Sequence, residues 1–251
     1  MSETEVARAT VLVRPLRFTD HLSSMRAFLA QLGYSTRVSR DERWATMVGG
    51  SGEVALHDAA ISGSSSGETG LMFEVADAES LAVGFAEAGF GHVEIYDEAW
   101  GRVLRVRDGD TQLSFDERPD DFHGYQLDEP RPEHGIVSMP LLYGPPTGPL
   151  DRVLSAAGLV RLDEGDDERW RVWSAAGGGL VARQPPAAGS ASGAVRLGFR
   201  TQEPLPVLAR RLTAAGHEVV ALSDEFGGVL TVTDPDGESV IVQAAMENRP
   251  Y

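Results

Sequence analysis

The chain lacks two residue types altogether: its 251 residues include no cysteine and no lysine. Without cysteine there can be no disulfide, no thiolate nucleophile and no thiolate-ligated metal. Without lysine there can be no Schiff base and no phosphate-binding loop of the Walker type. The 22 basic residues are therefore all arginines, and against 38 acidic residues they leave a net charge of −16. A field of this sign predicts that the chain binds neither nucleic acid nor an anionic membrane surface.

Long hydrophobic runs are also missing. No apolar stretch approaches the roughly 20 residues that a membrane span needs. Residues 1–10 are polar and lack the apolar segment of a signal peptide. We therefore predict a cytoplasmic protein. Its hydrophobic content of 42% is ordinary for a globular chain, and its length suits one large or two medium domains.

The chain does contain an internal repeat. The tetrapeptide Asp-Glu-Arg-Trp at residues 41–44 recurs at residues 167–170, an offset of 126 (167 − 41 = 126). The same offset aligns Leu71 with Leu197 and Trp100 with Phe226. A repeat of this length predicts two copies of one structural unit.

Each half in turn shows one order of elements twice. Residues 11–18 predict a strand, Asp20 is the expected N-cap of the following helix, and Gly33 ends that helix. Three short strands follow, and the order restarts near residue 71, with Asp77 as the next N-cap. We predict an α+β fold of four βαβββ modules. The expected parts are an N-terminal tail (1–10), a first domain (11–117), a linker (118–135) and a second domain (136–246).

The ends of the modules carry a family resemblance. Residues 225–237 combine an aromatic-Gly hairpin with Asp-Pro-Asp-Gly, and residues 73–77, Phe-Glu-Val-Ala-Asp, lead from a strand into a helix. With the module order, these features resemble the vicinal oxygen chelate superfamily of glyoxalase I, extradiol dioxygenases and bleomycin-resistance proteins. The resemblance spans nearly residues 11–245. It implies two tandem glyoxalase-like domains, each a curved mixed sheet around a cleft.

The resemblance also implies where a metal would bind. In this family a divalent ion is usually held by His, Gln or Glu on the first and last strands of the modules. The matching positions here are Val13, Ala55, Gly70, Ser114, Ser138, Val181, Arg196 and Ile241. None of them is His, Glu, Gln or Asp, and arginine repels a cation. We therefore predict no metal and no other cofactor.

Strand alternation predicts which side chains line the first cleft. The expected set is Arg17, His57, Met72 and Glu74. His57 is the one histidine of six that this pattern directs into a cleft, and a histidine beside a carboxylate can act as a general base. His57 and Glu74 are thus the candidate catalytic residues. The alternative is a buried ion pair without a catalytic role.

The second cleft is expected to be rich in arginine. Its predicted ligand-binding residues are Trp173, Arg183, Arg196, Arg200 and Gln243. Guanidinium groups match carboxylates and stack on aromatic planes, which favours a planar or acidic ligand. The alternative is that two of these arginines pair with acids at the rim. Trp173 has no aromatic counterpart in the first half, which favours ligand stacking, although a core position is the commoner role of a tryptophan.

The leading functional hypothesis is a metal-free small-molecule binding protein that sequesters a hydrophobic or aromatic, and acidic, compound, as the bleomycin-resistance branch does. An alternative is a lyase, isomerase or dioxygenase-like enzyme of the same superfamily. A third is a protein–protein module with collapsed clefts. A monomer and a homodimer are both compatible with the duplication.

Overall fold

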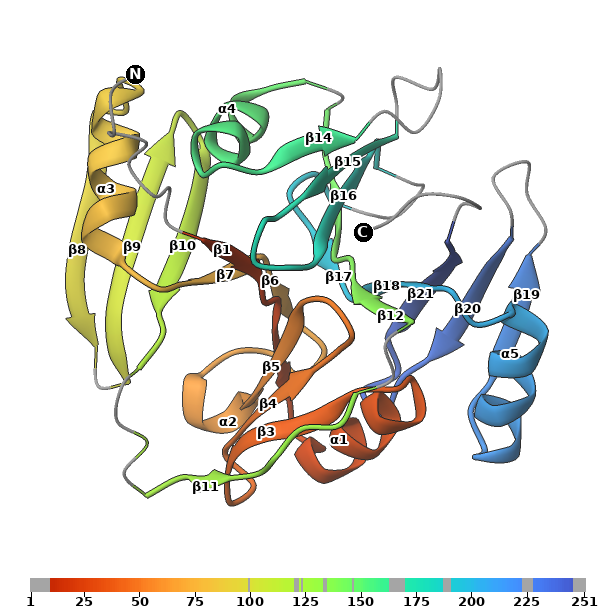
Figure 1. The fold of residues 1–251 in the computed structure, drawn as a ribbon. Coiled ribbons are helices and arrows are strands. Elements are labelled where there is room, and N and C mark those ends of the chain that lie inside the picture. The colour runs from red at the N-terminus through yellow and green to blue at the C-terminus, as the bar shows by residue number, and fades with distance from the viewer. Residues whose placement is uncertain are drawn as a thin grey trace, which may run out of the picture.

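The computed structural model describes residues 10–98, 100–119, 122, 124–132, 135–145, 147–162, 170–186, 191–222 and 228–245. These residues form an α+β fold of four mixed sheets with few helices, as the sequence predicted (Figure 1). None of the helices in the described part is both long enough and apolar enough to cross a membrane.

The first half of the chain builds two sheets. In spatial order, sheet A contains β1 (Val11–Val13), β7 (Met72–Val75), β10 (Thr111–Glu117), β9 (Gly101–Asp108) and β8 (His92–Glu98). Sheet B contains β11 (Gln126–Leu127), β3 (Ser35–Arg40), β4 (Trp44–Val48), β5 (Glu53–Asp58), β2 (Leu16–Thr19) and β6 (Thr69–Gly70). Strand β11 comes from the predicted linker, so part of that segment extends sheet B.

The second half builds the other two sheets. Sheet C contains β12 (Ile136–Ser138), β18 (Gly198–Thr201), β21 (Ser239–Ala244), β20 (Val229–Thr233) and β19 (Val219–Leu222). Sheet D contains β14 (Val160–Leu162), β15 (Arg171–Ser174), β16 (Leu180–Gln184), β13 (Leu141–Tyr143) and β17 (Val195–Arg196). The helices are α1 (Leu22–Gln31), α2 (Ala59–Ser62), α3 (Ala78–Glu87), α4 (Pro149–Ala156) and α5 (Leu205–Ala214).

The first strand of each half is divided between two sheets. Residues 11–18 were expected to form one strand, but the strand breaks at Arg14 and Pro15. Strand β1 pairs antiparallel with β7, whereas β2 pairs parallel with β5 in the other sheet. Pro140 lies at the same kind of break between β12 and β13. Proline has no N–H for a ladder hydrogen bond, so the chain leaves one sheet there and enters the next.

One of the two predicted N-caps is confirmed. Asp77 caps α3, because its carboxylate accepts from the N–H of Ser80 at 2.9 Å. The Asp20 prediction was wrong: the residue before α1 is His21, whose side chain makes no capping hydrogen bond. The hydroxyl of Thr19 accepts from the N–H of His21 at 3.0 Å instead.

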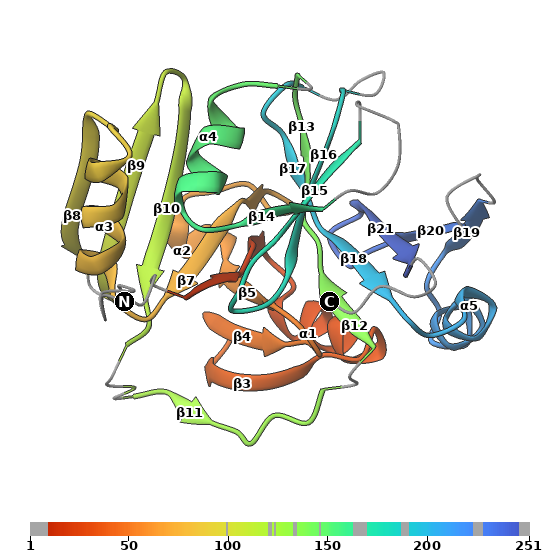
Figure 2. The ribbon, with the colours of Figure 1, turned by 45° about the horizontal axis from the view of Figure 1, so that its top comes forward.

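Each core joins one quarter of the first half with one quarter of the second half. One core packs β1, α3 and sheet A against α4 and Trp173 of the second half. The other packs α1 and sheet B against α5, Phe199 and strands of sheet C. Figures 1 and 2 show the consequence: α4 lies against the sheet formed by β8, β9 and β10, although it belongs to the other half. The two halves therefore depend on each other for burial of their apolar surface.

Tight turns at the centre hold the halves together. The N–H of Val13 donates to the carbonyl of Gly178 at 3.0 Å, and the N–H of Ser138 donates to the carbonyl of Ser51 at 2.9 Å. A side chain at Gly179, where φ is +84°, would place its Cβ 2.6 Å from that of Val13. Glycine is therefore required at this approach of two backbones.

Candidate ligand-binding site

A cavity of about 580 Å³ lies between sheets A and B. We call it the first cup. Its walls include four aromatic side chains and five arginines: Trp44, Trp100, Phe122 and Tyr125, and Arg14, Arg37, Arg40, Arg102 and Arg118. Carboxylates of sheet A complete the lining: Glu74, Asp97, Asp116 and Glu117. The site therefore combines flat apolar surfaces with a dense set of charges.

A buried carboxylate, Glu74 on β7, organises the floor of the first cup. Only 1% of its surface is exposed. It accepts from Arg14 Nη1 at 2.8 Å, Arg37 Nη2 at 3.3 Å and Arg118 Nε at 2.5 Å. A buried carboxylate is stable only when hydrogen bonds and opposite charges replace its water. These three guanidinium groups meet that requirement.

Two further buried carboxylates extend this ion network. Arg14 Nη2 contacts Asp116 on β10 at 2.5 Å, and Arg37 Nη2 contacts Glu53 on β5 at 2.9 Å. Three acids on three strands thus alternate with arginines across both sheets. Among the described residues, Arg14 Nε and Asp116 Oδ1 are buried atoms without a hydrogen-bond partner.

The acids of the network differ in pKa. Burial alone would raise the pKa of Glu74, but the combined attraction of Arg14, Arg37 and Arg118 outweighs it and lowers the pKa. Burial raises the pKa of Glu53, and the negative charge of Glu74 adds to the effect. Burial also raises the pKa of Asp116, despite the attraction of Arg14. Glu74 is therefore the most firmly ionised acid of the three.

The rim of the first cup carries aromatic rings and more accessible guanidinium groups. Arg40 lies over the ring of Tyr125, 5.3 Å from its centroid. Trp44 donates its Nε1–H to Thr46 at 3.2 Å and stands edge-on to His57, with ring centroids 5.5 Å apart. The side chain of Arg118 is 53% exposed, although its Nε is held by Glu74. Stacking surfaces and hydrogen-bond donors thus lie next to each other.

The interior between sheets C and D, which we call the second cup, is different. Seven buried apolar side chains occupy its described part: Val137, Met139, Leu141, Tyr143, Val172, Leu180 and Ala182. Trp170, the repeat counterpart of Trp44, packs against this cluster. Arg200 also faces this cup and donates to Gln243 at 2.9 Å.

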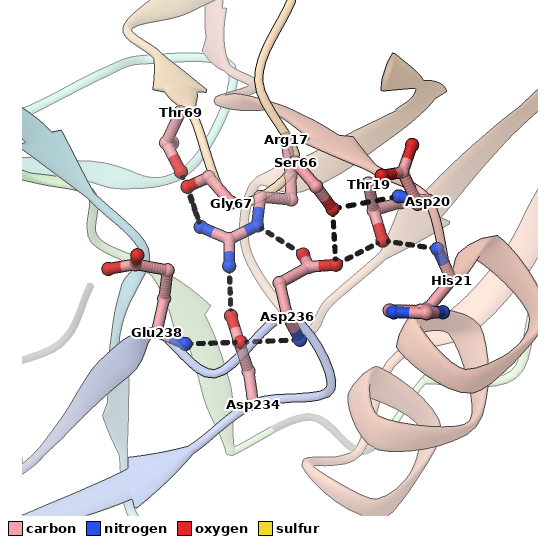
Figure 3. Close-up of polar contacts among 10 residues, drawn as sticks. All are labelled: Arg17, Thr19, Asp20, His21, Ser66, Gly67, Thr69, Asp234, Asp236 and Glu238. Atoms are coloured by element: carbon pink, nitrogen blue, oxygen red, sulfur yellow. Dashed lines mark hydrogen bonds and ion pairs between the residues drawn. The ribbon is translucent and has the colours of Figure 1, made fainter. Parts of the chain in front are cut away.

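The predicted cluster of Arg17, His57 and Glu74 does not form. Arg17 points away from the first cup and contacts Asp234 and Asp236 of the Asp-Pro-Asp-Gly turn in the other half (Figure 3). The alternation assigned to residues 11–18 was one residue out of phase, because both faces of this segment are buried. Arg14, rather than Val13 or Arg17, therefore faces the cup.

His57 and Glu74 both lie on the side of their strands that faces the first cup, but they do not contact each other in the described structure. His57 Nδ1 is 2.8 Å from the carbonyl oxygen of Asp58. Met72 lies two residues before Glu74 and shares its face of β7. The acid–base pair suggested by the sequence is therefore separated, and Glu74 is committed to its arginines.

The five residues predicted for the second cleft divide into two groups. Arg196, Arg200 and Gln243 do face the second cup, where Arg196 lies over the ring of Tyr143 at 5.7 Å. Arg183 and Trp173 lie on the opposite, helix-packed face. Arg183 contacts Asp151 of α4 at 2.9 Å and covers the ring of Trp173, which is 1% exposed in the core. The phase assigned to β16 was wrong, so these two residues do not meet the other three.

The residues that line the cups do not fit a divalent metal ion. In the first cup Glu53, Glu74 and Asp116 are each already paired with arginine. Within the described residues there is no group of three or more His, Asp or Glu side chains that could hold an ion. In the second cup the described cluster is apolar, and the polar side chains predicted for this cup are the two arginines and Gln243. Repulsion by guanidinium groups opposes a cation in either place.

The sequence did not predict most of the charged residues that form the ion network and rim of the first cup. Arg37, Arg40, Glu53, Asp116 and Arg118 were not named as site residues. A signal existed, because charged residues at alternate positions of otherwise apolar strands must face either water or one another. What pairs with what depends on strand neighbours far apart in sequence, as with Arg14 and Asp116.

No family model matches the sequence, and no curated protein matches it. Solved structures do match. A catechol 2,3-dioxygenase aligns over 96% of this chain and 89% of its own, with a TM-score of 0.60 and 12% identity. The 2,3-dioxygenase LapB from Pseudomonas sp. KL28 aligns over 100% and 96%, with a TM-score of 0.59 and 14% identity. The Mn(II)-bound glyoxalase from Novosphingobium aromaticivorans aligns over 95% and 84%, with a TM-score of 0.57 and 14% identity.

These neighbours identify the architecture. The chain has the fold of these dioxygenases and this glyoxalase, which is the fold that the resemblance in the sequence predicted. At these identities the likeness defines the fold, and the chemistry must be argued from the side chains of the cups.

Proposed function

We propose that this chain binds a small aromatic compound with an acidic group in the first cup, without a metal ion, and sequesters it as bleomycin-resistance proteins do with their drug. The observation that carries the proposal is the cavity of about 580 Å³, walled by four aromatic rings and five arginines. Ligand sites in proteins usually measure roughly 300 to 1,000 Å³. The volume therefore suits a compound of one or two rings with its substituents.

The two kinds of lining residue have complementary roles. Trp44, Trp100 and Tyr125 offer flat faces on which an aromatic ring can stack. Guanidinium groups bind carboxylates through two parallel N–H donors. Among the described residues no ion pair is found for Arg40, and only the Nε of Arg118 is engaged. These two arginines are the natural partners of the acidic group.

Isothermal titration of aromatic carboxylates, each against its neutral amide, tests the proposal. We expect the carboxylate to bind at least tenfold more tightly, because a charge-assisted hydrogen bond contributes about 1.5–3 kcal/mol. Arg40→Gln should remove most of this preference, and Trp44→Leu should weaken both members of each pair. Arg196→Gln, in the second cup, is the matched control and should leave both affinities unchanged.

Two outcomes would contradict the proposal. One is a panel in which no aromatic acid binds. The other is loss of binding in Arg196→Gln with retention in Arg40→Gln, which would move the ligand to the second cup.

An enzyme is the second candidate, because the similar structures carry the names of dioxygenases and a glyoxalase. A lyase, isomerase or dioxygenase-like reaction would need a group that moves a proton. His57 is a candidate, since its Nδ1 is held by a backbone carbonyl and its Nε2 is on the far side of the ring. Turnover that is lost in His57→Ala while ligand affinity is retained would favour the enzyme over the binding protein.

A further inference from the structure

We infer that Arg14 takes the place of a metal ion in the first cup. Glu74 and Asp116 occupy paired positions on the neighbouring strands β7 and β10, and both carboxylates face the cup. The guanidinium of Arg14 joins them, with contacts of 2.8 Å and 2.5 Å. A single buried cation thus bridges two acids from adjacent strands.

The third acid comes from the opposite sheet. Glu53 on β5 contacts Arg37 at 2.9 Å, and the same nitrogen of Arg37 lies 3.3 Å from Glu74. Carboxylate oxygens from several strands that converge on one positive centre are what a hard divalent cation requires. Here the positive charge is divided between two guanidinium groups: Arg14 contacts Glu74 and Asp116, and Arg37 contacts Glu53 and Glu74.

The charge balance of the network also indicates that an arginine replaces a metal ion here. Three carboxylates and the three guanidinium groups of Arg14, Arg37 and Arg118 balance, so removal of Arg14 would leave one net negative charge buried. Asp116 is only 6% exposed, and its Oδ1 is one of the buried oxygens without a partner among the described residues. A carboxylate oxygen thus remains for a cation once the guanidinium is gone.

This inference concerns the cation of the first cup and does not depend on which organic compound binds there. A guanidinium that is part of the chain cannot be removed by a chelator. It also offers no open coordination position to an oxygen atom of a ligand. The first cup would then recognise its ligand by charge and hydrogen bonds alone.

Titration with Mn²⁺ alone, without any organic ligand, tests the inference in the wild type, Arg14→Ala and Arg14→His. We expect no saturable Mn²⁺ binding and no change in Tm for the wild type. Each variant should lose on the order of 10 °C in Tm. Each should then bind one Mn²⁺ per chain and regain at least half of that loss. The added change Asp116→Asn should abolish Mn²⁺ binding by either variant.

Arg131→Ala is the matched control, because Arg131 and Glu129 form an exposed arginine–carboxylate pair at 3.7 Å. We expect this variant neither to bind Mn²⁺ nor to change in Tm. Tight binding of one Mn²⁺ by the wild type, lost in Asp116→Asn, would overturn the inference. So would folded Arg14→Ala or Arg14→His protein that binds no Mn²⁺. Folded variants that bind no Mn²⁺ would leave the proposed function intact, and Mn²⁺ binding by the wild type would remove only its metal-free part. Binding of aromatic acids is measured separately, so the two can fail separately.

Discussion

The two cups share one backbone arrangement but differ in their interiors, which are charged in the first cup and largely apolar in the second. The N–H of Arg14 donates to the carbonyl of Met72, and the N–H of Met139 donates in the same way to Gly198, so Arg14 and Met139 are equivalent. Glu74 and Arg200 are equivalent as well, at the repeat offset of 126 (200 − 74 = 126). A buried arginine in the first cup thus corresponds to a methionine in the second, and a buried glutamate corresponds to an arginine.

The comparison shows how such a fold changes its chemistry. The strand that holds Glu74 pairs with the strand that holds Asp116, just as the strand of Arg200 pairs with that of Gln243. Glu74 is surrounded by guanidinium groups, whereas Arg200 donates to the neutral amide of Gln243. A buried charge is stable only with partners of opposite charge or with hydrogen bonds. Such positions therefore change charge together with their partners and not one at a time.

The largest effect on stability is expected when the second cup receives an arginine at the position equivalent to Arg14. Met139→Arg would place an unpaired charge in the apolar cluster, where burial without a carboxylate is prohibitive. We expect a loss of at least about 5 kcal/mol in the free energy of unfolding, or failure to fold. Urea denaturation followed by circular dichroism measures it. A variant within about 1 kcal/mol of the wild type would behave like a surface substitution. That result would mean that water reaches the second cup.

A smaller loss in the free energy of unfolding is expected when the shared carboxylate of the first cup, Glu74, is removed. Glu74→Ala leaves Arg14, Arg37 and Arg118 without their shared carboxylate. Breaking a buried charge network on one side typically costs about 3–5 kcal/mol, discounted here because Arg118 is half exposed. The same denaturation experiment reports the loss. An unchanged midpoint would show that the network contributes nothing to stability.

Truncation in the second cup should cost less and should not depend on salt. Leu180 is 1% exposed within the apolar cluster, and Leu180→Ala should cost about 2–4 kcal/mol through lost burial and a cavity. Repeating both denaturations at high and low salt separates the cups. The cost of Leu180→Ala should not change with ionic strength. That of Glu74→Ala should change slightly, because salt screens the half-exposed Arg118 but screens buried pairs little.

The smallest effect is a difference in pH dependence inside the first cup. The pKa of Glu74 is lowered, so its contribution to stability is present at neutral pH and is lost as the pH falls through its folded value. The pKa of Glu53 is raised, so its contribution is largest at acid pH and declines as the pH rises from the ordinary value towards the folded one. The cost of Glu74→Gln should therefore grow from pH 4 to pH 7, while that of Glu53→Gln should shrink. Parallel trends would contradict the assignment.

The sequence predicted the architecture better than the interior of the cups. The repeat and the module ends identified the fold, and alternation placed Glu74, Arg196, Arg200 and Gln243 on cup-facing sides. It failed for residues 11–18 and for β16 (Leu180–Gln184), because these segments are buried on both faces and carry no clear alternation of polar and apolar residues. The ion network was beyond sequence reasoning, since Arg14 meets Asp116 only through strand pairing across 102 positions.

The cores shared between the two halves, and the contacts of Arg17 with Asp234 and Asp236, have a consequence for synthesis of the chain. Arg17 emerges from the ribosome long before its partners, which lie 217 and 219 positions later. Part of the apolar surface that covers α1 comes from Leu208 and Leu212, which also lie far along the chain from α1. The packing of the first quarter thus cannot be completed until residues 208–236 have been synthesised, and until then part of its surface stays uncovered.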